Sequence, residues 1–508
     1  MYLLGIDIGT SATKTVLFDH SGKPVSSASA EYPLYQPKNG WAEQEPADWW
    51  DAVCETAKKV VSGIDPKEID GIGLSGQMHG LVLLDQEDRV LRRSIIWCDQ
   101  RTGAQAEKLN ELIGEKGLIE ITANPALTGF TAAKILWVKE NEPQVWAKTA
   151  KIMLPKDYIR YMLTGEFATE VSDAGGMQLL DVPKRRWSEK MLKALEIDEK
   201  KLPKVFESIE ISGKVCKKAA ERTGLAAGTP VAGGSGDQAA GAIGSGIVKS
   251  GAASCALGSS GVVFAVADKP LIDPKGRIHT LCHAIPDTWH VMGVAQASGL
   301  SLKWLRDNFF EDVSATAGLM KVDPYYLMDK MAEKVPVGAD GLIYLPYLMG
   351  ERTPHRDPDC RGVFFGLSAA HGRTEMIRAV LEGVAFSLCD SLSIIRELGV
   401  RVDFVRVAGG GAKSALWKQI IADCFDCELR TLATDEGPAL GVALLAGVGS
   451  GVYNSVPEAC EAAVHDCASI LPNPENTSKY RSFYELYQRL YRSLERDYKA
   501  LAELRGRS

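Results

Sequence analysis

The chain has 508 residues and a formal net charge of −7 at pH 7, with 58 Lys and Arg against 65 Asp and Glu. This length exceeds the size at which a single hydrophobic core stops growing, so we expect two domains. An acidic chain with a pI of about 5.8 carries no excess of positive charge for binding nucleic acid or anionic lipid. We therefore expect neither nucleic acid nor a membrane as a partner.

The N-terminal segment and the cysteines both favour the cytoplasm. The apolar run in MYLLGIDIGT contains Asp7 and follows no basic stretch, which is the pattern of neither a signal peptide nor a membrane span. Eleven cysteines without framework spacing indicate reduced thiols rather than disulfides. We expect a cytoplasmic location.

The first half of the chain begins with strands and continues with a helix. Residues 2–8 and 13–19 are apolar and rich in β-branched side chains, and residues 24–32 follow the turn HSGK, so three antiparallel strands are predicted. Residues 45–61 carry apolar side chains at helical spacing after a proline suited to the first helical turn. Residues 69–75, IDGIGLS, predict a buried strand that ends in the turn SGQMHG.

The second half repeats this order of elements. Residues 253–266 predict two strands around a Gly-Ser turn, and residues 289–295 predict a third. Helices are predicted over residues 300–310 and 375–398, and FVRVAGGGAKS, from residue 404, predicts a strand that runs into a glycine turn. We therefore expect two similarly built α/β domains facing one another across a cleft, where the functional site would lie.

The boundaries of these domains rest on the repeat alone. We predict an N-terminal domain over residues 1–247, a C-terminal domain over residues 248–475 and a charged amphipathic helix over residues 476–508. Within the repeat, DQAAGAIGSG from Asp237 has a counterpart in DEGPALGVALLAGVGSG from Asp435. Each segment is an acidic residue followed by a predicted helix of small residues.

Asp237 lies in the stretch VAGGSGDQAAGAIGSG and is the only charged residue between Arg222 and Lys249. One interpretation is that Asp237 caps the N-terminus of the helix that follows, since Asp is a favoured capping residue. The other is that the glycines clear space for a substrate to approach a catalytic carboxylate. Taken alone, the stretch favours the cap about two to one.

Two hairpin turns carry hydroxyl groups at equivalent places in the repeat. Asp7 ends the first strand before Thr10 and Ser11, and Ser259 and Ser260 lie in the corresponding turn of the second half. These segments are either ordinary turns or phosphate-binding turns, with Asp7 orienting Mg²⁺ in the second interpretation. Two such hairpins pointing into one cleft are a more specific signal than either alone.

Two further turns leave similar alternatives open. The glycines of VAGGGAKS, residues 407–414, form either a bare connection or a surface that a flat ligand approaches closely. Met78 and His79 in GQMHG are either structural or in contact with a ligand. Their place in a turn that mirrors VAGGGAKS makes these two interpretations about equally strong.

Eight motifs, in order and spacing, resemble those of the FGGY family of carbohydrate kinases over nearly the whole chain. They are DIGTSATK, GLSGQMHG, LPKDY, GGSGDQAAGA, LGSSGV, YLMGERTPH, RGVFFGL and VAGGGAKS. The resemblance implies two domains of the actin-like, ribonuclease-H-like ATPase fold with a cleft between them. The GQMHG and GERTPH segments most resemble those of members that act on xylulose.

The resemblance also implies an activity and roles for the candidate residues. The reaction would transfer the γ-phosphoryl group of ATP to the 5-hydroxyl of D-xylulose, with Asp237 as the catalytic base and with Mg²⁺ served by Asp7 and Asp237. Met78, His79 and Asp237 would contact the sugar in the N-terminal domain. The implied nucleotide-binding residues, mainly of the C-terminal domain, are Thr10, Ser11, Ser259, Ser260, Gly409, Gly410 and Lys413. A homodimer is left open.

Two positions depart from the family pattern, and a rival function remains. Gln238 stands where Asn is more common, which puts a sugar contact from that position in doubt, and Ser259 stands where many relatives carry Thr. The rival is an actin-like ATPase without a metabolite acceptor, from which the polar GQMHG turn would distinguish a kinase. The runner-up among kinases is an FGGY enzyme that acts on another sugar or polyol.

Overall fold

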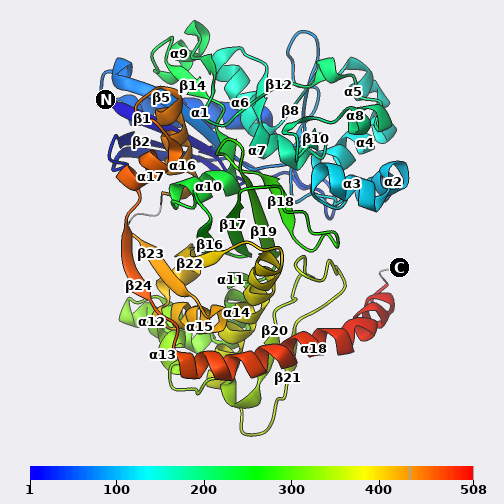
Figure 1. The fold of residues 1–508 in the computed structure, drawn as a ribbon, viewed down its shortest axis with the longest axis vertical. Coiled ribbons are helices and arrows are strands. Elements are labelled where there is room, and N and C mark those ends of the chain that lie inside the picture. Colours follow the sequence, from blue (N-terminus) through cyan, green and yellow to red (C-terminus); the bar gives the residue numbers. More distant parts are fainter. Residues whose placement is uncertain (434–435, 507–508) are drawn as a thin grey trace.

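Two seven-stranded mixed sheets form the framework of the protein (Figure 1). The structure is a computed structural model that describes residues 1–433 and 436–506. The strands of the first sheet are β1 (Tyr2–Ile8), β2 (Ala12–Asp19), β3 (Pro24–Glu31), β5 (Ile69–Gly76), β13 (Ile211–Lys214), β14 (Pro230–Ala232) and β15 (Ser235–Gly236). The strands of the second sheet are β16 (Gly251–Leu257), β17 (Gly261–Ala267), β18 (His279–Cys282), β19 (Trp289–Ala295), β22 (Val402–Ala408), β23 (Glu428–Leu432) and β24 (Asp466–Ile470).

The two sheets share one topology, which confirms the predicted repeat. In the first sheet β1, β2 and β3 are antiparallel neighbours, β5 runs parallel to β1, and β14 runs parallel to β5. In the second sheet β16, β17 and β19 are antiparallel neighbours, β22 runs parallel to β16, and β23 runs parallel to β22. β18 is an additional edge strand that the sequence analysis did not predict.

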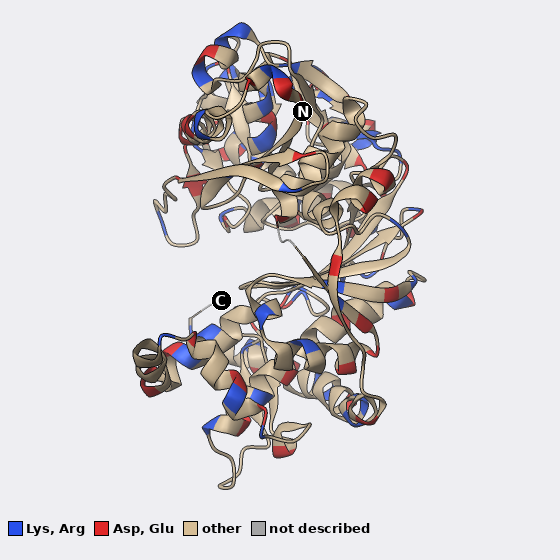
Figure 2. Cartoon of the chain, turned by 90° about the vertical axis from the view of Figure 1, so that its left-hand side faces the viewer, with Lys and Arg blue, Asp and Glu red and all other residues tan. Residues whose placement is uncertain are grey.

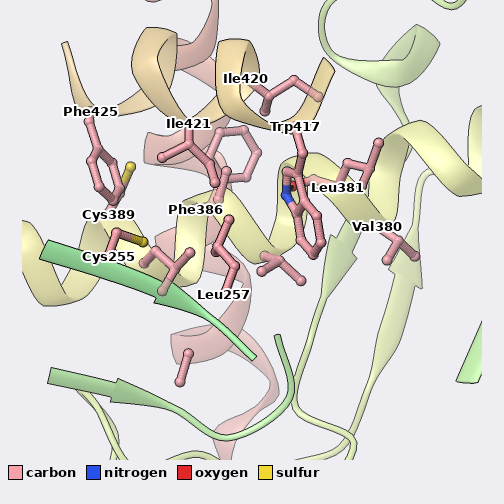
Figure 3. Packing of buried hydrophobic residues seen from close by; sticks show 14 of the residues in the cluster. Cys255, Leu257, Val380, Leu381, Phe386, Cys389, Trp417, Ile420, Ile421 and Phe425 are labelled. Atoms are coloured by element: carbon pink, nitrogen blue, oxygen red, sulfur yellow. Dashed lines mark hydrogen bonds between the residues drawn. The ribbon is translucent and has the colours of Figure 1, made fainter. Parts of the chain in front are cut away.

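The main helices also form where the sequence predicts them. α1 (Pro46–Val61) has its proline in the first turn and buries Trp49 in the core of the first sheet. α11 (Gly299–Phe309) and the long α14 (Arg373–Glu397) accompany the second sheet. Trp417 on α15 (Ala415–Phe425) packs among Phe386, Leu257 and other core residues (Figure 3), and its indole Nε1 donates to the Leu381 carbonyl over 3.0 Å.

α10 (Asp237–Gly244) and α16 (Gly437–Gly449) lie side by side between the sheets (Figure 1). Although α16 lies in the sequence between β23 and β24 of the second sheet, it packs on β1 and β5 of the first. A Cβ added to Gly5 would overlap the Ala439 carbonyl oxygen, and one added to Gly73 would overlap that of Val442. The domain boundary between residues 247 and 248 stays a prediction. α16 belongs to the second half by sequence but packs against the sheet of the first half. Asp435 lies outside the described residues.

The remaining helices extend the two halves. In the first half these are α2 (Gly103–Ile113), α3 (Glu115–Thr122), α4 (Thr131–Asn141), α5 (Pro143–Lys148), α6 (Pro155–Thr164), α7 (Val171–Ala174), α8 (Glu189–Ala194) and α9 (Lys217–Thr223). In the second half these are α12 (Glu311–Met320), α13 (Pro324–Ala332), α17 (Val456–Ala463) and α18 (Pro474–Leu504). α18 buries Tyr480, Tyr487 and Tyr498 in the core of the second sheet, so the predicted C-terminal helix packs against the second half.

Charged residues of both signs are interspersed along both halves of the chain (Figure 2). Many of them pair locally, as Lys59 does with Glu55 and Lys479 with Glu475 one helical turn away. Within residues 1–433 and 436–506, no helix combines the length and apolar character needed to cross a membrane.

Candidate active site

Two pockets contain most of the predicted site residues. The first, with a volume of about 220 Å³, is named here the interdomain pocket because side chains from both halves line it. Its lining residues are Met78, His79, Trp97, Leu127, Gly129, Phe130, Asp237, Gln238, Ser260, Val262, His279, Met292, Val294 and Arg352. The second, of about 530 Å³, is named the second-half pocket and is lined by residues 257–259, 299, 300, 302, 303, 323, 325, 326, 329, 410, 411, 413, 414 and 417.

Asp237 is the first helical residue of α10 and does not occupy its cap position. The expectation that Asp237 caps this helix is therefore wrong. The cap position belongs to Gly236, whose extended backbone pairs with Gly76 of β5. The side chain of Asp237 instead lines the interdomain pocket, where Gln238 Nε2 donates to its Oδ1 over 3.4 Å.

The environment of Asp237 gives its carboxyl group an unusual proton affinity. Burial, and to a smaller extent the negative charge of Asp7, raises the pKa of Asp237 to about 7. A general base works best when its pKa lies near the operating pH. Asp237 therefore has the position and the pKa of a base that could accept a proton from a bound hydroxyl group.

The turn after β5 places Met78 and His79 in the interdomain pocket. His79 has a φ of 67°, a left-handed conformation that is uncommon for a residue other than glycine. Its carbonyl oxygen accepts hydrogen bonds from Lys134 Nζ at 2.7 Å and from Thr131 Oγ1 at 3.0 Å. The start of α4 thus holds this turn in a conformation that is costly by itself, which is typical of functional sites.

Two glycines make room for the Met78 and His79 side chains. A Cβ on Gly176 would overlap the imidazole of His79, and a Cβ on Gly236 would come within 2.9 Å of the Met78 sulfur. The close approach lets His79 Nδ1 lie 2.9 Å from the Gly176 carbonyl oxygen. Burial lowers the pKa of His79 to about 3, so its imidazole is neutral at physiological pH.

Asp7 lies at the end of β1, opposite Lys14 on β2 and Ser75 on β5. Burial raises the pKa of Asp7, and its Oδ1 has no hydrogen-bond partner among the described residues. A second carboxylate, that of Asp237, is close enough for Asp7 to raise its pKa. An unpartnered carboxylate oxygen beside another carboxylate fits Mg²⁺, which is commonly bound through one or two carboxylates, water and substrate phosphates. The described residues contain no cluster of three metal-binding side chains.

Thr10 and Ser11 are not lining residues of either pocket. The Thr10 hydroxyl accepts a hydrogen bond from the indole Nε1 of Trp97 over 2.9 Å, and Trp97 lines the interdomain pocket. The first hairpin turn is therefore connected to this pocket through Trp97. A phosphate contact by Thr10 or Ser11 stays a prediction.

The second hairpin turn adjoins both pockets. Ser260 lines the interdomain pocket, whereas its neighbour Ser259 lines the second-half pocket. The start of α11 supports the turn, because Gly299 N donates to the Gly258 carbonyl over 2.8 Å and Leu300 N to that of Ser259 over 3.1 Å. The hydroxyl groups of this turn are therefore placed beside both pockets, Ser260 at the first and Ser259 at the second.

The glycine turn after β22 contributes to the second-half pocket. Gly410 and Lys413 line it, but Gly409 is not a lining residue. Gly409 has a φ of 88°, and a Cβ at this position would come within 2.9 Å of the Leu257 carbonyl oxygen. Glycine is required at this position because of the left-handed backbone conformation and the close packing against β16.

Several pocket residues were not predicted from the sequence. Phe130 and His279 lie in segments without a motif, and their only signal is their residue type. Arg352 lies within the YLMGERTPH motif, which could have identified it. Gln238, for which a sugar contact was put in doubt, lines the pocket beside Asp237.

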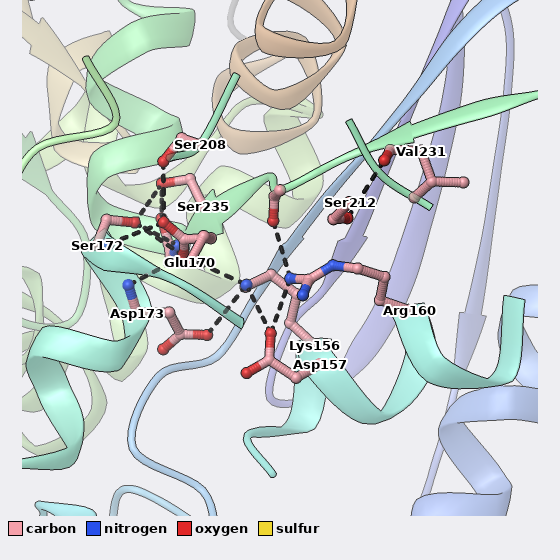
Figure 4. A network of polar contacts seen from close by, with 12 residues as sticks. Lys156, Asp157, Arg160, Glu170, Ser172, Asp173, Ser208, Ser212, Val231 and Ser235 are labelled. Carbon is pink, nitrogen blue, oxygen red and sulfur yellow. Dashed lines mark hydrogen bonds and ion pairs between the residues drawn. The ribbon is translucent and has the colours of Figure 1, made fainter. Parts of the chain in front are cut away.

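A buried polar network, also missed, lies next to the start of α10 (Figure 4). Lys156, in the LPKDY motif, has its Nζ 3.3 Å from Glu170 Oε1 and 3.6 Å from Asp173 Oδ2. The Ser172 hydroxyl donates to Glu170 over 3.1 Å and accepts from Gly236 N over 3.1 Å. Because Gly236 precedes Asp237, this network holds the backbone that carries the candidate base.

Comparison with known proteins identifies the family. The model of the N-terminal domain of the FGGY family of carbohydrate kinases matches residues 2–244, and the model of its C-terminal domain matches residues 253–450. The chain belongs to the FGGY family of carbohydrate kinases. It is therefore a sugar kinase, and the family implies ATP as the phosphoryl donor.

Individual relatives match this FGGY kinase over nearly its whole length. It is 42% identical to the xylulose kinase of Bacillus subtilis (strain 168) over 492 residues, or 96% of each chain. It is 38% identical to the xylulose kinase of Escherichia coli (strain K12) over 496 residues, which cover 97% of this chain and 99% of the relative. A crystal structure of a "xyloylose kinase" from Brucella ovis matches with a TM-score of 0.90 and 36% identity, covering 97% of this chain and 99% of that chain. The predicted two-domain α/β fold is thereby confirmed.

Proposed function

We propose that this FGGY kinase transfers the γ-phosphoryl group of ATP to the 5-hydroxyl of D-xylulose, yielding D-xylulose 5-phosphate. The observation that carries the proposal is the buried carboxylate of Asp237, whose pKa is raised to about 7 in a pocket lined by both halves of the protein. The choice of sugar rests on the relatives named xylulose kinases, which are 42% and 38% identical to this chain over nearly full length.

In the proposed reaction Asp237 accepts the proton of the attacking hydroxyl group. Met78 and His79 position the sugar, and the Ser259–Ser260 turn presents its donors to the phosphoryl group. The location of this turn between the two pockets supports that role. Fixed donors aimed at the transferred group stabilise the charge that develops during phosphoryl transfer.

The nucleotide is proposed to occupy the second-half pocket. The backbone of Gly410 and Gly411 lets a flat base or ribose approach closely, and Lys413 offers a positive charge. Thr10 and Ser11 are proposed to contact the phosphates from the first half. Asp7 and Asp237 would hold Mg²⁺, which supplies neutralising charge to the phosphate oxygens when it is bound.

The reaction is proposed to take place in the cytoplasm. The eleven cysteines are free thiols, as is usual for proteins of a reducing compartment.

ADP release with a panel of ketoses, aldoses and polyols tests the proposal. The highest kcat/KM is expected with D-xylulose, with little ADP release when no sugar is present. If another sugar or polyol gives a clearly higher kcat/KM, that compound and not D-xylulose is the acceptor of this FGGY kinase. ADP release that no sugar stimulates would favour an ATPase without an acceptor.

A further inference from the structure

We propose that His279, from the second half of the chain, is a sugar-binding residue paired with His79, and that both imidazoles accept hydrogen bonds from hydroxyl groups of the sugar. This inference rests on the proposed function, because it assumes a sugar in the interdomain pocket. It adds a specificity-determining contact that connects the acceptor to the second sheet.

The two histidines meet the same pocket from different halves of the chain. His79 follows β5, whereas His279 is the first residue of β18, and both line the interdomain pocket. Phe130 contacts both rings edge-on, with centroid separations of 4.7 Å to His79 and 5.9 Å to His279. Phe130 therefore fixes both imidazoles relative to one another.

The hydrogen bond of His79 determines where its proton lies. His79 Nδ1 is 2.9 Å from the carbonyl oxygen of Gly176, which can only accept a hydrogen bond. Nδ1 therefore carries the hydrogen. Because burial lowers the pKa of His79 to about 3, the ring holds no second proton, and Nε2 presents a lone pair.

The partner of His279 leads to the same tautomer. Asn124 Nδ2 donates to the carbonyl oxygens of Thr122 at 2.9 Å and Thr280 at 2.8 Å, which fixes the amide orientation. Asn124 Oδ1 must then accept from His279 Nδ1, 2.8 Å away. Burial lowers the pKa of His279 to about 3, so its Nε2 also presents a lone pair.

Both Nε2 atoms are left for a ligand. Within residues 1–433 and 436–506 neither has a hydrogen-bond partner, yet neither is sealed from solvent. The ring nitrogens of His290, in contrast, are unpartnered and fully enclosed. Two imidazole acceptors require a ligand that donates hydrogen bonds, as hydroxyl groups do and a carbonyl oxygen does not. The guanidinium of Arg352, close enough to lower the pKa of both histidines, supplies a donor for the remaining oxygen atoms.

Sugar analogues combined with His279 variants test the proposal. The dissociation constants of the preferred acceptor and of its 1-, 3- and 4-deoxy analogues are measured without ATP, by titration calorimetry. We expect His279→Ala to weaken binding of the parent sugar about threefold to tenfold, the usual effect of one lost neutral hydrogen bond. One deoxy analogue should lose a similar factor with the wild type and almost nothing further with His279→Ala.

Two further variants separate a sugar contact from support of the fold. His279→Gln keeps an acceptor oxygen and should recover part of the lost affinity, whereas His371→Ala, outside both pockets, should bind like the wild type. Unchanged sugar binding by His279→Ala and His279→Gln, with the wild type phosphorylating the sugar, would overturn this inference alone. Deoxy penalties that persist undiminished in folded His279→Ala would also overturn it. A wild type that neither binds nor phosphorylates any sugar would overturn the proposed function as well.

Discussion

The pKa of Asp237 has a consequence for the pH dependence of catalysis. Only the ionised carboxylate can accept a proton, and burial together with Asp7 raises its pKa to about 7. We therefore predict that kcat rises about tenfold per pH unit below pH 7 and levels off above it. Initial rates at saturating sugar and ATP between about pH 5.5 and pH 8.5 provide the measurement. A profile that is flat across this range, or that falls with rising pH, would contradict the assignment.

His79 should act on the sugar and not on the nucleotide. It lines the interdomain pocket and is not a lining residue of the second-half pocket. We predict that His79→Ala raises the KM for the sugar about threefold to tenfold, equivalent to about 0.5–1.5 kcal/mol for one neutral hydrogen bond. The KM for ATP should change little. If steady-state kinetics show equal effects on both constants, His79 supports the fold and not the sugar.

Some of the individual residues of the site could be predicted from the sequence. Asp237, Met78 and His79 stood out because small residues surround them, and the structure brings all three into one pocket. The capping role of Asp237 was wrong because the helix begins one residue earlier than expected, and Gly236, whose extended backbone pairs with Gly76, takes the cap position. His279 could not be selected, since its partner Asn124 is 155 residues away in the chain.

The packing of α10 against α16 determines what the smallest residues of these helices do. A Cβ added to Gly441 of α16 would overlap the Ala240 carbonyl oxygen of α10, and the two backbones leave no room to absorb it. We predict that Gly441→Ala lowers the free energy of unfolding by about 1–3 kcal/mol, as overpacking does. Urea unfolding followed by circular dichroism measures the change.

Gly318→Ala in α12 is the matched control for this prediction. Nothing lies within 4 Å of a Cβ at Gly318, so this substitution should stabilise the protein by about 0.5–1 kcal/mol through helix propensity alone. If Gly441→Ala proves as stable as Gly318→Ala, the backbones of α10 and α16 have room for a methyl group, which contradicts the prediction.

Local sequence patterns predicted the elements that repeat in the two halves and few of their long-range contacts. Apolar runs located β1, β2 and β5, because these strands are largely buried, and the helical spacing of apolar residues located α14. β18 was missed because HTLC offers only four residues, too short for a periodic signal. The packing of α16 on the first sheet depends on the glycines of β1 and β5, which a local pattern does not connect to that helix.

In the proposed reaction, the interdomain pocket and the second-half pocket hold the sugar and the nucleotide, which must meet at one phosphoryl group. Side chains from both halves line the interdomain pocket, but Thr10 and Ser11 line neither pocket. The turn between α10 and β16 is held by Arg406, whose Nη1 donates to the Ser245 and Gly246 carbonyls at 2.9 Å each. If Thr10 and Ser11 contact the phosphates as proposed, the halves must rotate so that the first hairpin approaches the second-half pocket and water is excluded.

Closure predicts coupling between the two substrates. We expect a smaller radius of gyration in small-angle scattering when sugar and a non-hydrolysable ATP analogue are both present. By linkage, the sugar should tighten nucleotide binding by the same factor as the nucleotide tightens sugar binding. Unchanged scattering together with independent affinities would mean that the halves do not move on binding.

The central claim is that the buried carboxylate of Asp237 removes a proton from the sugar hydroxyl group that becomes phosphorylated. The most direct measurement is kcat of Asp237→Asn with D-xylulose and saturating ATP, since this change keeps the shape of the side chain and removes the base. We predict that kcat falls by about 10²-fold to 10⁴-fold, with no loss of thermal stability because the substitution removes a buried ionisable group. Turnover close to that of the wild type would contradict the claim.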